Sequence, residues 1–437
     1  MPSLQTRLAS SIGEDEMIQK LAELVALESV VEDGHTEYKV AQAVSAWCVE
    51  DSLTFELSEV SPGRPNLLIE WRGKRPGPAL LFEAHSDTVT AGDLSQWSRL
   101  PFRLTREGDR VYGRGTADTK GNLVAAYIGI RELVRTTQGN FPGCLRLLVP
   151  IDEEGMMTGI RHYIASGGTA DVKAAICCEP EDAQVCIRQK GALRLRVEIH
   201  GKMAHGAMPL TGSNPLPVLA RFLVAIAEEE IREQERMGFD TLLGWPSMTP
   251  TEIRSPLAGV SGFNVVPGAA AVSLDIRTVV GQSHRDLTQR IQQNLDEVLE
   301  EANRSIREGR VCRLRHPLGE SIDPGEFHGT VVVVDDRPVT DTPVDHAVVQ
   351  SVVAAVHERL GVPAVLSGVP GATDGTWLWE AGIPIVTVGA GHRYVPHQAD
   401  EWVSLRQLCD IAVIYGDAAY RFLTAMEGVE VEEVNDG

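Results

Sequence analysis

Apolar runs of strand length recur before residue 190 of this chain and again near residue 385, and they alternate with stretches of helical periodicity. The runs are Asn66–Ile69, Ala79–Ala84, Cys144–Pro150, Ala174–Cys178 and Ile383–Val388. Helical spacing of apolar residues covers Glu16–Val30, Tyr38–Val49 and Leu123–Val134. Strands that are apolar throughout are buried on both faces, and their alternation with helices is typical of α/β proteins. The sequence therefore predicts an α/β domain with a largely buried sheet.

Between these two regions the pattern changes. Apolar and polar residues alternate from Leu193 to Ile199, which is the period of a sheet with one face in water. Helices are expected over Pro215–Arg236 and His284–Asn303, and strands over Thr249–Ile253, Ala270–Arg277 and either Cys312–Arg315 or Val331–Val334. The order β-α-β-β-α-β predicts a small α+β domain inserted into the first one. We expect one domain of residues 1–190 with 338–437, and a second of residues 191–337.

Length and charge limit the classes of protein that this chain can form. Its 437 residues exceed the size at which one hydrophobic core usually stops growing, which agrees with two domains. The formal net charge of -21 repels phosphate backbones, so nucleic acid is not an expected partner. No stretch is long and apolar enough for a membrane helix, and the acidic N-terminal region lacks a secretory signal. We therefore expect a cytoplasmic protein without membrane contact.

Potential metal ligands follow four of the apolar runs. His85 and Asp87 come after the run that ends at Ala84, and Glu153 and Glu154 come after the run that ends at Pro150. Glu179 directly follows Cys178, and His397 follows Val388 at a short distance in sequence. In open α/β sheets, ligands bind beyond the carboxyl ends of the strands. Residues far apart in sequence can therefore converge at that edge of the sheet.

A fifth group of candidate ligands is the single residue Asp118. It lies in the glycine-rich segment Gly113–Gly121, just before an expected helix. Taken alone, such an aspartate is explained by helix capping, because its side chain can accept hydrogen bonds from the unpaired backbone N–H groups of the first helical turn. The glycines on both sides favour instead a close approach to a bound group.

The residue types fit a metal centre. If His85 binds a metal, Asp87 can accept the second imidazole N–H and fix the ring. Glu153 and Glu154 could be a solvated pair, but adjacent carboxylates at the end of a buried strand repel each other unless a cation lies nearby. Two histidines and three carboxylates, with Asp118 able to bridge, suit two zinc-like ions better than magnesium or calcium.

These residues fall in a set of motifs that resembles a known enzyme family. In order, the motifs are His85-Ser86-Asp87, GRGTADTKG around Asp118, Glu153-Glu154, Glu179-Pro180, KMAHGAMP around His205, NVVPG from Asn264, LDIR up to Arg277, GATDG from Gly371 and HQADE from His397. The set is similar to the metallopeptidases typified by acetylornithine deacetylase, succinyl-diaminopimelate desuccinylase and glutamate carboxypeptidase. It spans nearly the whole chain. The resemblance implies a zinc-peptidase-like catalytic domain with a mixed, largely parallel sheet, and an inserted ferredoxin-like domain used as a lid and for dimerisation.

The resemblance also implies a role for each residue. Of two divalent ions, zinc first and cobalt or manganese as alternatives, one would be held by His85 and Glu179 and the other by Glu154 and His397. Asp118 would bridge the ions, Glu153 would be the general base, and Asp87 would be a further catalytic residue. His205 would stabilise the oxyanion in the site of the other subunit of a homodimer. Thr119 stands where relatives often carry Met, and Gly206 and Thr211 lie where relatives vary, so the acyl group stays undetermined.

Substrate contacts are expected from Arg277, Asn264, Gly371 and Thr373. The guanidinium of Arg277 suits a carboxylate, although pairing with Asp275 is the ordinary alternative for such an arginine. Backbone N–H groups between Gly368 and Thr376 could hold the same anion or simply form a turn.

Two ions, a base and an oxyanion donor predict hydrolysis of an amide bond in a small N-acyl amino acid or short peptide. A dipeptidase, a carboxypeptidase, or a hydrolase of an unusual amide or aryl amine would use the same machinery, because pocket shape decides the substrate. A non-catalytic binding protein is a further alternative, but it would usually have lost a ligand or the base.

Overall fold

The computed structural model describes residues 2–30, 37–308 and 323–427. The chain separates into two compact units. Unit 1 consists of residues 1–189, 340–369 and 373–437, and unit 2 consists of residues 190–339 and 370–372. The boundaries expected from the sequence differ from these by one residue near residue 190 and by two residues near residue 339. The expected division placed Gly371 with the catalytic residues, whereas the structure groups Gly371 with unit 2.

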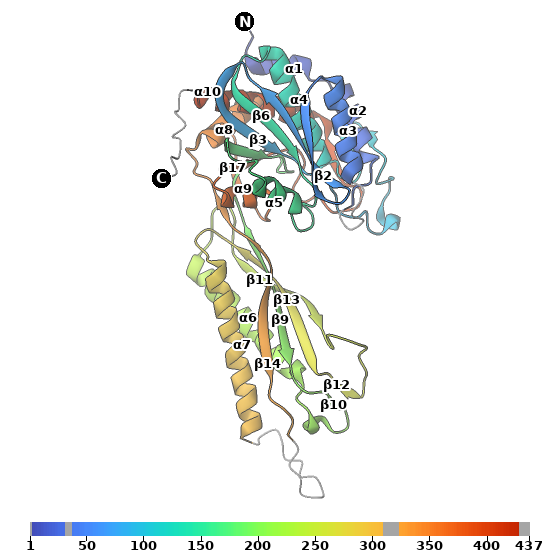
Figure 1. The fold of residues 1–437 in the computed structure, drawn as a ribbon, viewed down its shortest axis with the longest axis vertical. Coiled ribbons are helices and arrows are strands. Elements are labelled where there is room, and N and C mark those ends of the chain that lie inside the picture. The colour runs from blue at the N-terminus through green and yellow to red at the C-terminus, as the bar shows by residue number, and fades with distance from the viewer. Residues whose placement is uncertain (1, 31–36, 309–322, 428–437) are drawn as a thin grey trace, which may run out of the picture. The chain divides into compact units, whose positions relative to one another are not determined.

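Unit 1 is built on a nine-stranded mixed sheet in the order β1-β2-β6-β3-β7-β17-β8-β15, with β16 beside β8 (Figure 1). The strands are β1 Thr54–Ser61, β2 Arg64–Arg72, β3 Arg75–Glu83, β6 Pro142–Val149, β7 Val172–Cys177, β8 Val185–Gln189, β15 Thr340–Asp341, β16 Leu366–Val369 and β17 Ile385–Thr387. The neighbours β6, β3, β7 and β17 run parallel. The outer pairs β1–β2, β2–β6 and β8–β15 are antiparallel. The predicted α/β class with a mixed sheet is confirmed.

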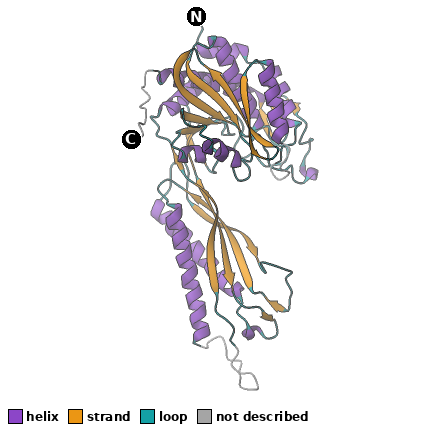
Figure 2. Ribbon diagram, in the orientation of Figure 1, coloured by secondary structure: helices purple, strands orange, loops and turns teal. Residues whose placement is uncertain are grey.

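Helices cover both faces of this sheet (Figure 2). On β3, Leu81 packs with Ile160 and Leu378, whereas its neighbour Phe82 meets Tyr415 edge-on. Successive strand residues point to opposite faces, so the helices that carry these partners lie on opposite sides. The helices of unit 1 are α1 Leu4–Ser11, α2 Glu14–Val25, α3 Glu37–Glu50, α4 Lys120–Thr137, α5 Thr158–Ala165, α8 Ala347–Leu360, α9 Gly375–Glu380 and α10 Leu405–Ala425. A small sheet, β18-β5-β4, joins Trp402–Ser404, Arg110–Tyr112 and Thr105–Glu107.

Close packing of α4 fixes the loop before it. Gly129 of α4 lies against α10, where a Cβ atom would come within 2.2 Å of the carbonyl oxygen of Ala412. At the start of the helix, the buried Lys120 ammonium donates to the carbonyls of Leu24 and Leu27, at 3.0 and 2.7 Å. Because α4 begins directly after Asp118 and Thr119, these contacts also hold the segment that carries Asp118.

Unit 2 has an antiparallel four-stranded sheet in the order β11-β13-β9-β14. Its elements are β9 Gly191–His200, β10 Ala204–His205, α6 Pro215–Met237, β11 Ser247–Arg254, β12 Val265–Val266, β13 Ala269–Thr278, α7 His284–Arg307 and β14 His328–Arg337. The chain order β9, α6, β11, β13, α7, β14 together with this strand order is the ferredoxin-like arrangement. The predicted strand Val331–Val334 lies within β14, and the alternative Cys312–Arg315 falls outside the described residues.

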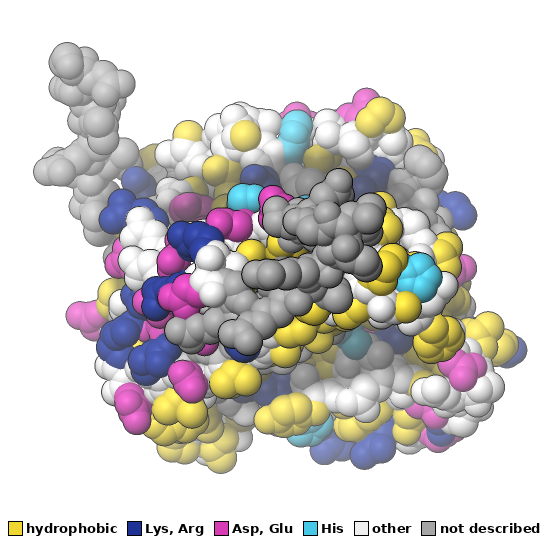
Figure 3. Space-filling model, turned by 90° about the horizontal axis from the view of Figure 1, so that it is seen from below, with side chains coloured by type: hydrophobic (Ala, Val, Ile, Leu, Met, Phe, Trp, Pro, Cys, Tyr) yellow, Lys and Arg dark blue, Asp and Glu magenta, His cyan; other side chains and the backbone are white. Residues whose placement is uncertain are grey.

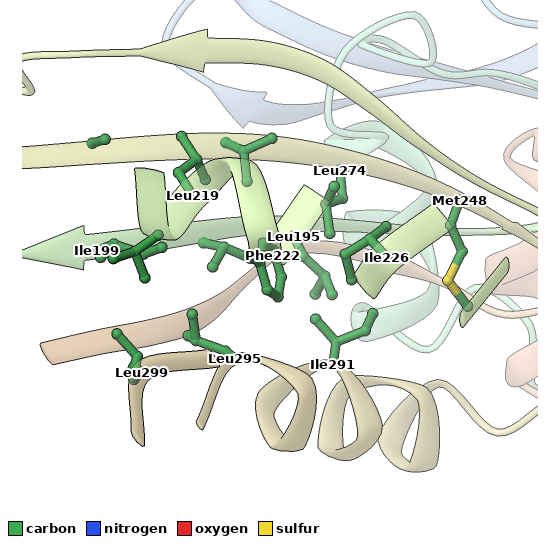
Figure 4. Packing of buried hydrophobic residues seen from close by; sticks show 14 of the residues in the cluster. Leu195, Ile199, Leu219, Phe222, Ile226, Met248, Leu274, Ile291, Leu295 and Leu299 are labelled. Atoms are coloured by element: carbon green, nitrogen blue, oxygen red, sulfur yellow. The ribbon is translucent and has the colours of Figure 1, made fainter. Parts of the chain in front are cut away.

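The core of unit 2 lies between its sheet and its two long helices (Figure 4). Leu195 and Leu274 from the sheet meet Phe222 of α6 and Ile291 of α7, and all four side chains are buried. In α7 the buried positions 287, 291, 295 and 299 recur every fourth residue, which places them on one stripe of the helix. The helix starts at a true cap, since the Ser283 side chain accepts the N–H of Asp286.

The surface carries mixed charge. On the face drawn in Figure 3, Lys and Arg side chains lie among Asp and Glu side chains. In the part of the chain that the structure describes, no helix combines the length and apolarity that crossing a membrane requires.

Candidate active site

Three neighbouring parallel strands bring candidate ligands to one edge of the sheet in unit 1. His85 follows β3, Glu153 and Glu154 follow β6, and Glu179 follows β7. Since β3 lies between β6 and β7, His85 stands between the two groups of glutamates. The predicted convergence at the carboxyl ends of the strands is therefore what the fold produces.

Asp118 lies between the two histidines. Its Oδ1 atom is 3.1 Å from His85 Nε2, and its Oδ2 atom is 3.3 Å from His397 Nε2. His85 Nε2 is also 3.8 Å from Glu179 Oε1, and His397 Nε2 is 3.0 Å from Glu154 Oε1. Each oxygen of Asp118 thus faces one histidine, each histidine lies near one glutamate, and the five side chains form two sets that share Asp118.

This donor set fits divalent metal ions. His85, Asp118 and Glu154 each offer a ligand atom, and these atoms lie within 4.8 Å of one another. Glu179 Oε1 is buried and has no hydrogen-bond partner among the described residues. Imidazole nitrogen together with carboxylate oxygen is the combination that zinc and related ions accept.

The electrostatics of the protein groups alone favour an added positive charge. Burial raises the pKa of Glu153 and of Glu179 well above the ordinary range, and the neighbouring carboxylates add to both shifts. Burial opposes ionisation of Asp118 too, but hydrogen bonds from His397 and His85 outweigh it and hold the pKa of Asp118 below its usual value. The hydrogen bonds to Asp118 and Glu154 raise the pKa of His397 to about 10. Carboxylates crowded in this way are stabilised by cations.

Asp87 makes contacts that differ from the expected one. Its carboxylate oxygens accept the backbone N–H groups of Glu153 and Glu154, at 3.1 and 3.0 Å. The second nitrogen of His85 lies 3.0 Å from the backbone carbonyl oxygen of Asp87 and 3.5 Å from its carboxylate. Asp87 therefore fixes the imidazole mainly through its backbone, and its side chain holds the segment that carries both glutamates.

Asp118 does not cap helix α4. Thr119 occupies the cap position and makes no side-chain capping bond, while the Asp118 carboxylate faces the two histidines. The Thr119 hydroxyl donates instead to the carbonyl of Cys178, which precedes Glu179. Thr119 thus connects the segment that carries Asp118 to the segment that carries Glu179.

Sequence reasoning missed Glu401, a buried residue that organises the Asp118 segment. Its carboxylate accepts the N–H groups of Gly115, Ala117 and Asp118 at 2.9–3.1 Å and a bond from Arg114 at 2.6 Å. Its position at the end of the HQADE motif, four residues after His397, was the only available signal. The motif itself does not reveal the contacts of Glu401.

Unit 2 brings two of its predicted site residues, His205 and Asn264, close together. His205 in β10 pairs with Val265 in β12, directly after Asn264, and the Gly206 N–H donates to the Asn264 carbonyl at 2.6 Å. The side chains of His205 and Asn264 are both exposed. Arg277 lies near the opposite end of β13, about 27 Å from its first residue at the usual rise per strand residue. Its guanidinium makes two bonds to Asp275, at 2.6 and 3.1 Å, which is the ordinary alternative for this arginine.

The two predicted substrate contacts in the glycine-rich segment, Gly371 and Thr373, fall in different units. Gly371 belongs to unit 2 and Thr373 to unit 1. Thr373 is buried, its N–H donates to Gln189 Oε1 at 3.1 Å, and its hydroxyl accepts from Gln189 Nε2 at 2.9 Å. The backbone N–H of Thr373 is therefore already used within the protein.

Comparison with known families gives a match over most of the chain. The model of peptidase family M20/M25/M40 matches residues 81–421. Among curated proteins, a probable succinyl-diaminopimelate desuccinylase of Staphylococcus aureus (strain MSSA476) is 25% identical, covering 95% of this chain and 99% of that protein.

Solved structures show the same fold. The dipeptidase Dug1p from Saccharomyces cerevisiae is similar with a TM-score of 0.73 at 14% identity, covering 96% of this chain and 98% of that chain. A dinuclear metal-binding peptidase of the M20 family from Bacillus subtilis is similar with a TM-score of 0.67 at 16% identity, covering 96% of this chain and 98% of that chain.

Proposed function

This chain belongs to peptidase family M20/M25/M40, and from that premise we propose that it hydrolyses the amide bond of a small N-acyl amino acid or short peptide with two divalent metal ions. It is a metal-dependent hydrolase of amide bonds. The observation that carries the two-ion proposal is the pair of histidine–glutamate sets that share the two oxygens of Asp118.

Each of the two histidine–glutamate sets would hold one ion. His85 and Glu179 would hold one ion, Glu154 and His397 the other, and Asp118 would bridge them. Zinc is the proposed ion, because its preference for mixed nitrogen and oxygen ligands matches the set. When bound, two such ions lower the pKa of a coordinated water towards neutrality and polarise a carbonyl oxygen.

The protein groups would then move the protons. Glu153 is 9% exposed and lies beside Glu154 without being needed as a ligand, which supports its role as general base. It would take a proton from the attacking water and give it to the leaving amine. Asp87 would hold Glu153 in place through the backbone N–H bond described above. His205 would donate to the developing oxyanion, a contribution on the order of 3 kcal/mol for one well-placed donor.

Unit 2 is proposed as the lid and dimerisation domain. The strand β9 begins at the chain connection at residue 190 and runs for ten residues, roughly 30 Å at the usual rise. His205 follows its far end. That His205 serves the partner subunit of a twofold dimer is proposed from the family resemblance.

The substrate is proposed to carry a carboxylate. Arg277, Asn264, Gly371 and Thr373 remain the proposed contacts; Arg277 would exchange Asp275 for the substrate anion, and Asn264, which lies beside His205, would reach the substrate together with His205. The desuccinylase relative supports an N-acyl amino acid, and the dipeptidase fold neighbour keeps a dipeptide as the second candidate. The cytoplasm stays the predicted compartment.

A metal-loaded substrate panel tests this function. Hydrolysis of N-acetyl, N-succinyl and N-carbamoyl amino acids is compared with that of simple dipeptides, in the presence of zinc, cobalt or manganese. We expect turnover of at least one N-acyl amino acid and about two ions per chain by elemental analysis. His85→Ala and Asp118→Ala should lose metal and activity together. A protein that binds no transition metal and cleaves nothing in the panel would contradict the proposal.

A further inference from the structure

The segment that carries His397 is irregular at that residue. It extends from Gly391 to Asp400, between β17 and β18, without helix or strand. His397 has a φ of 66°, and its side chain is 54% exposed. Ligands of a metal site keep their position through the residues that support them. The neighbours of His397 therefore decide where its imidazole lies.

Arg393 anchors this segment to the one that carries Glu179. Its guanidinium pairs with Glu181, which is 4% exposed and lies two residues after Glu179. The same guanidinium donates to the carbonyl of Gly368 at 3.2 Å and to the Ser367 hydroxyl at 3.3 Å. Arg393 is thus held by groups from two other segments of unit 1.

Backbone contacts reinforce the same junction. The N–H of Asp182 donates to the carbonyl of Gly391 at 2.8 Å, and the N–H of Ala183 donates to that of Gly389 at 2.9 Å. They fix the start of the segment, two residues before Arg393 at the nearest. Between Gly391 and His397, Arg393 is the residue whose side chain reaches a buried partner.

The other end of the segment is held differently. Glu401 binds the backbone of the Asp118 loop, and Asp118 faces both histidines. A change at Glu401 would therefore affect both sets of ligands. A change at Arg393 would remove a side-chain anchor of the His397 segment, while the backbone contacts of Gly389 and Gly391 remain and His85, Asp118 and Glu179 keep their contacts.

We propose that Arg393 is a positioning residue for the metal ion held by Glu154 and His397. This inference rests on the two-ion site of the proposed function. It predicts different effects on the two ions, because loss of the Arg393 contacts should weaken the binding of one ion and leave the binding of the other unchanged.

Calorimetric titration of the metal-free protein with cobalt, followed also by the visible absorption of the bound ions, tests this. We expect two ions in the wild-type protein. Arg393→Met should bind one ion with unchanged affinity and the second about 10–100-fold more weakly, the usual effect of losing a supporting residue. Arg393→Lys, which keeps the charge, should recover part of the loss. The control Arg359→Met breaks a comparable pair with Asp410 between α8 and α10, and it should still bind two ions.

A double variant separates positioning from damage. Arg393→Met leaves Glu181 buried without its guanidinium partner, two residues from Glu179. In Arg393→Met with Glu181→Gln that charge is removed, and the second ion should remain weak. Recovery of the second ion in the double variant, or wild-type binding by Arg393→Met itself, would overturn the inference. Fewer than two ions in the wild-type protein would contradict the proposed function and this inference with it.

Discussion

The carboxylate of Glu401 accepts the backbone N–H of Asp118 at 3.1 Å, although 283 positions separate the two residues in sequence. Two further N–H groups of the same loop and the buried Arg114 guanidinium point at that carboxylate. Hydrogen bonds to an ionised acceptor are about twice as strong as neutral ones. The loop that presents Asp118 is therefore shaped by a residue that lies outside it, four residues after His397, another of the proposed ligands.

Glu401→Gln should weaken metal binding without changing any ligand. The amide keeps the size of the side chain but loses the charge that gathers the loop N–H groups, so we expect affinity for both ions to fall about 10–100-fold. Metal titration measures this. Glu401→Ala should also lower the free energy of unfolding by about 3–5 kcal/mol, because Arg114 would stay buried without its carboxylate. Unchanged affinity in Glu401→Gln would show that the loop keeps its shape unaided.

Glu153→Ala and Glu154→Ala should separate the base from the ligand. A base acts on protons, whereas a ligand holds the ion. We expect Glu153→Ala to keep its metal while turnover falls by about 10²–10⁴-fold, the usual contribution of a general base. Glu154→Ala should lose metal, because Glu154 lies 3.0 Å from His397 Nε2. Equal loss of metal in both variants would contradict the assignment.

Mixing two inactive variants tests whether His205 acts across a dimer. His205→Ala and Glu153→Ala chains are combined under conditions that allow subunits to exchange. About half of the dimers would be mixed, each with one complete site, so activity should recover to roughly a quarter of wild type by twofold symmetry. Subunit exchange is followed separately with labelled chains. Demonstrated exchange without recovery would place the action of His205 in its own chain or outside catalysis.

Stability should fall in acid through the pair of Glu16 and Arg131. The guanidinium bonds both carboxylate oxygens, at 2.6 and 2.7 Å, and this bonding lowers the pKa of Glu16. A carboxylate with a lowered folded-state pKa stabilises the fold above its unfolded-state pKa, and the contribution is lost as pH falls through the folded value.

Glu16→Gln should therefore be less stable than wild type at pH 7, and the difference should shrink below about pH 4, near the unfolded pKa of glutamate. Urea unfolding at pH 7 and below about pH 4 measures the difference in the free energy of unfolding between Glu16→Gln and wild type. The matched control is Glu14→Gln on the same helix, whose exposed pair with Arg106 should contribute less than about 1 kcal/mol at either pH. A difference between Glu16→Gln and wild type that does not depend on pH would contradict the electrostatic origin.

The sequence by itself was enough to predict the fold class and the place in the fold where the candidate ligands meet. Apolar runs such as Ala79–Ala84 and the alternating stretch from Leu193 are local patterns, and they report directly which faces of a strand are buried. His85, Glu154 and Glu179 follow such runs, and the geometry of parallel strands then requires that they meet at one edge. These predictions needed only local periodicity and one general property of sheets.

Only the tertiary structure determined the supporting contacts. Glu401 and Arg393 act through partners that are distant in sequence, and no periodicity identifies which backbone N–H or which glutamate a buried side chain reaches. The Asp87 carboxylate accepts two backbone N–H groups rather than the imidazole N–H, and this likewise depends on where β6 ends relative to β3. Residue types and spacing report local burial, whereas hydrogen-bond partners follow from how separate segments pack, and that packing exists only in the folded chain.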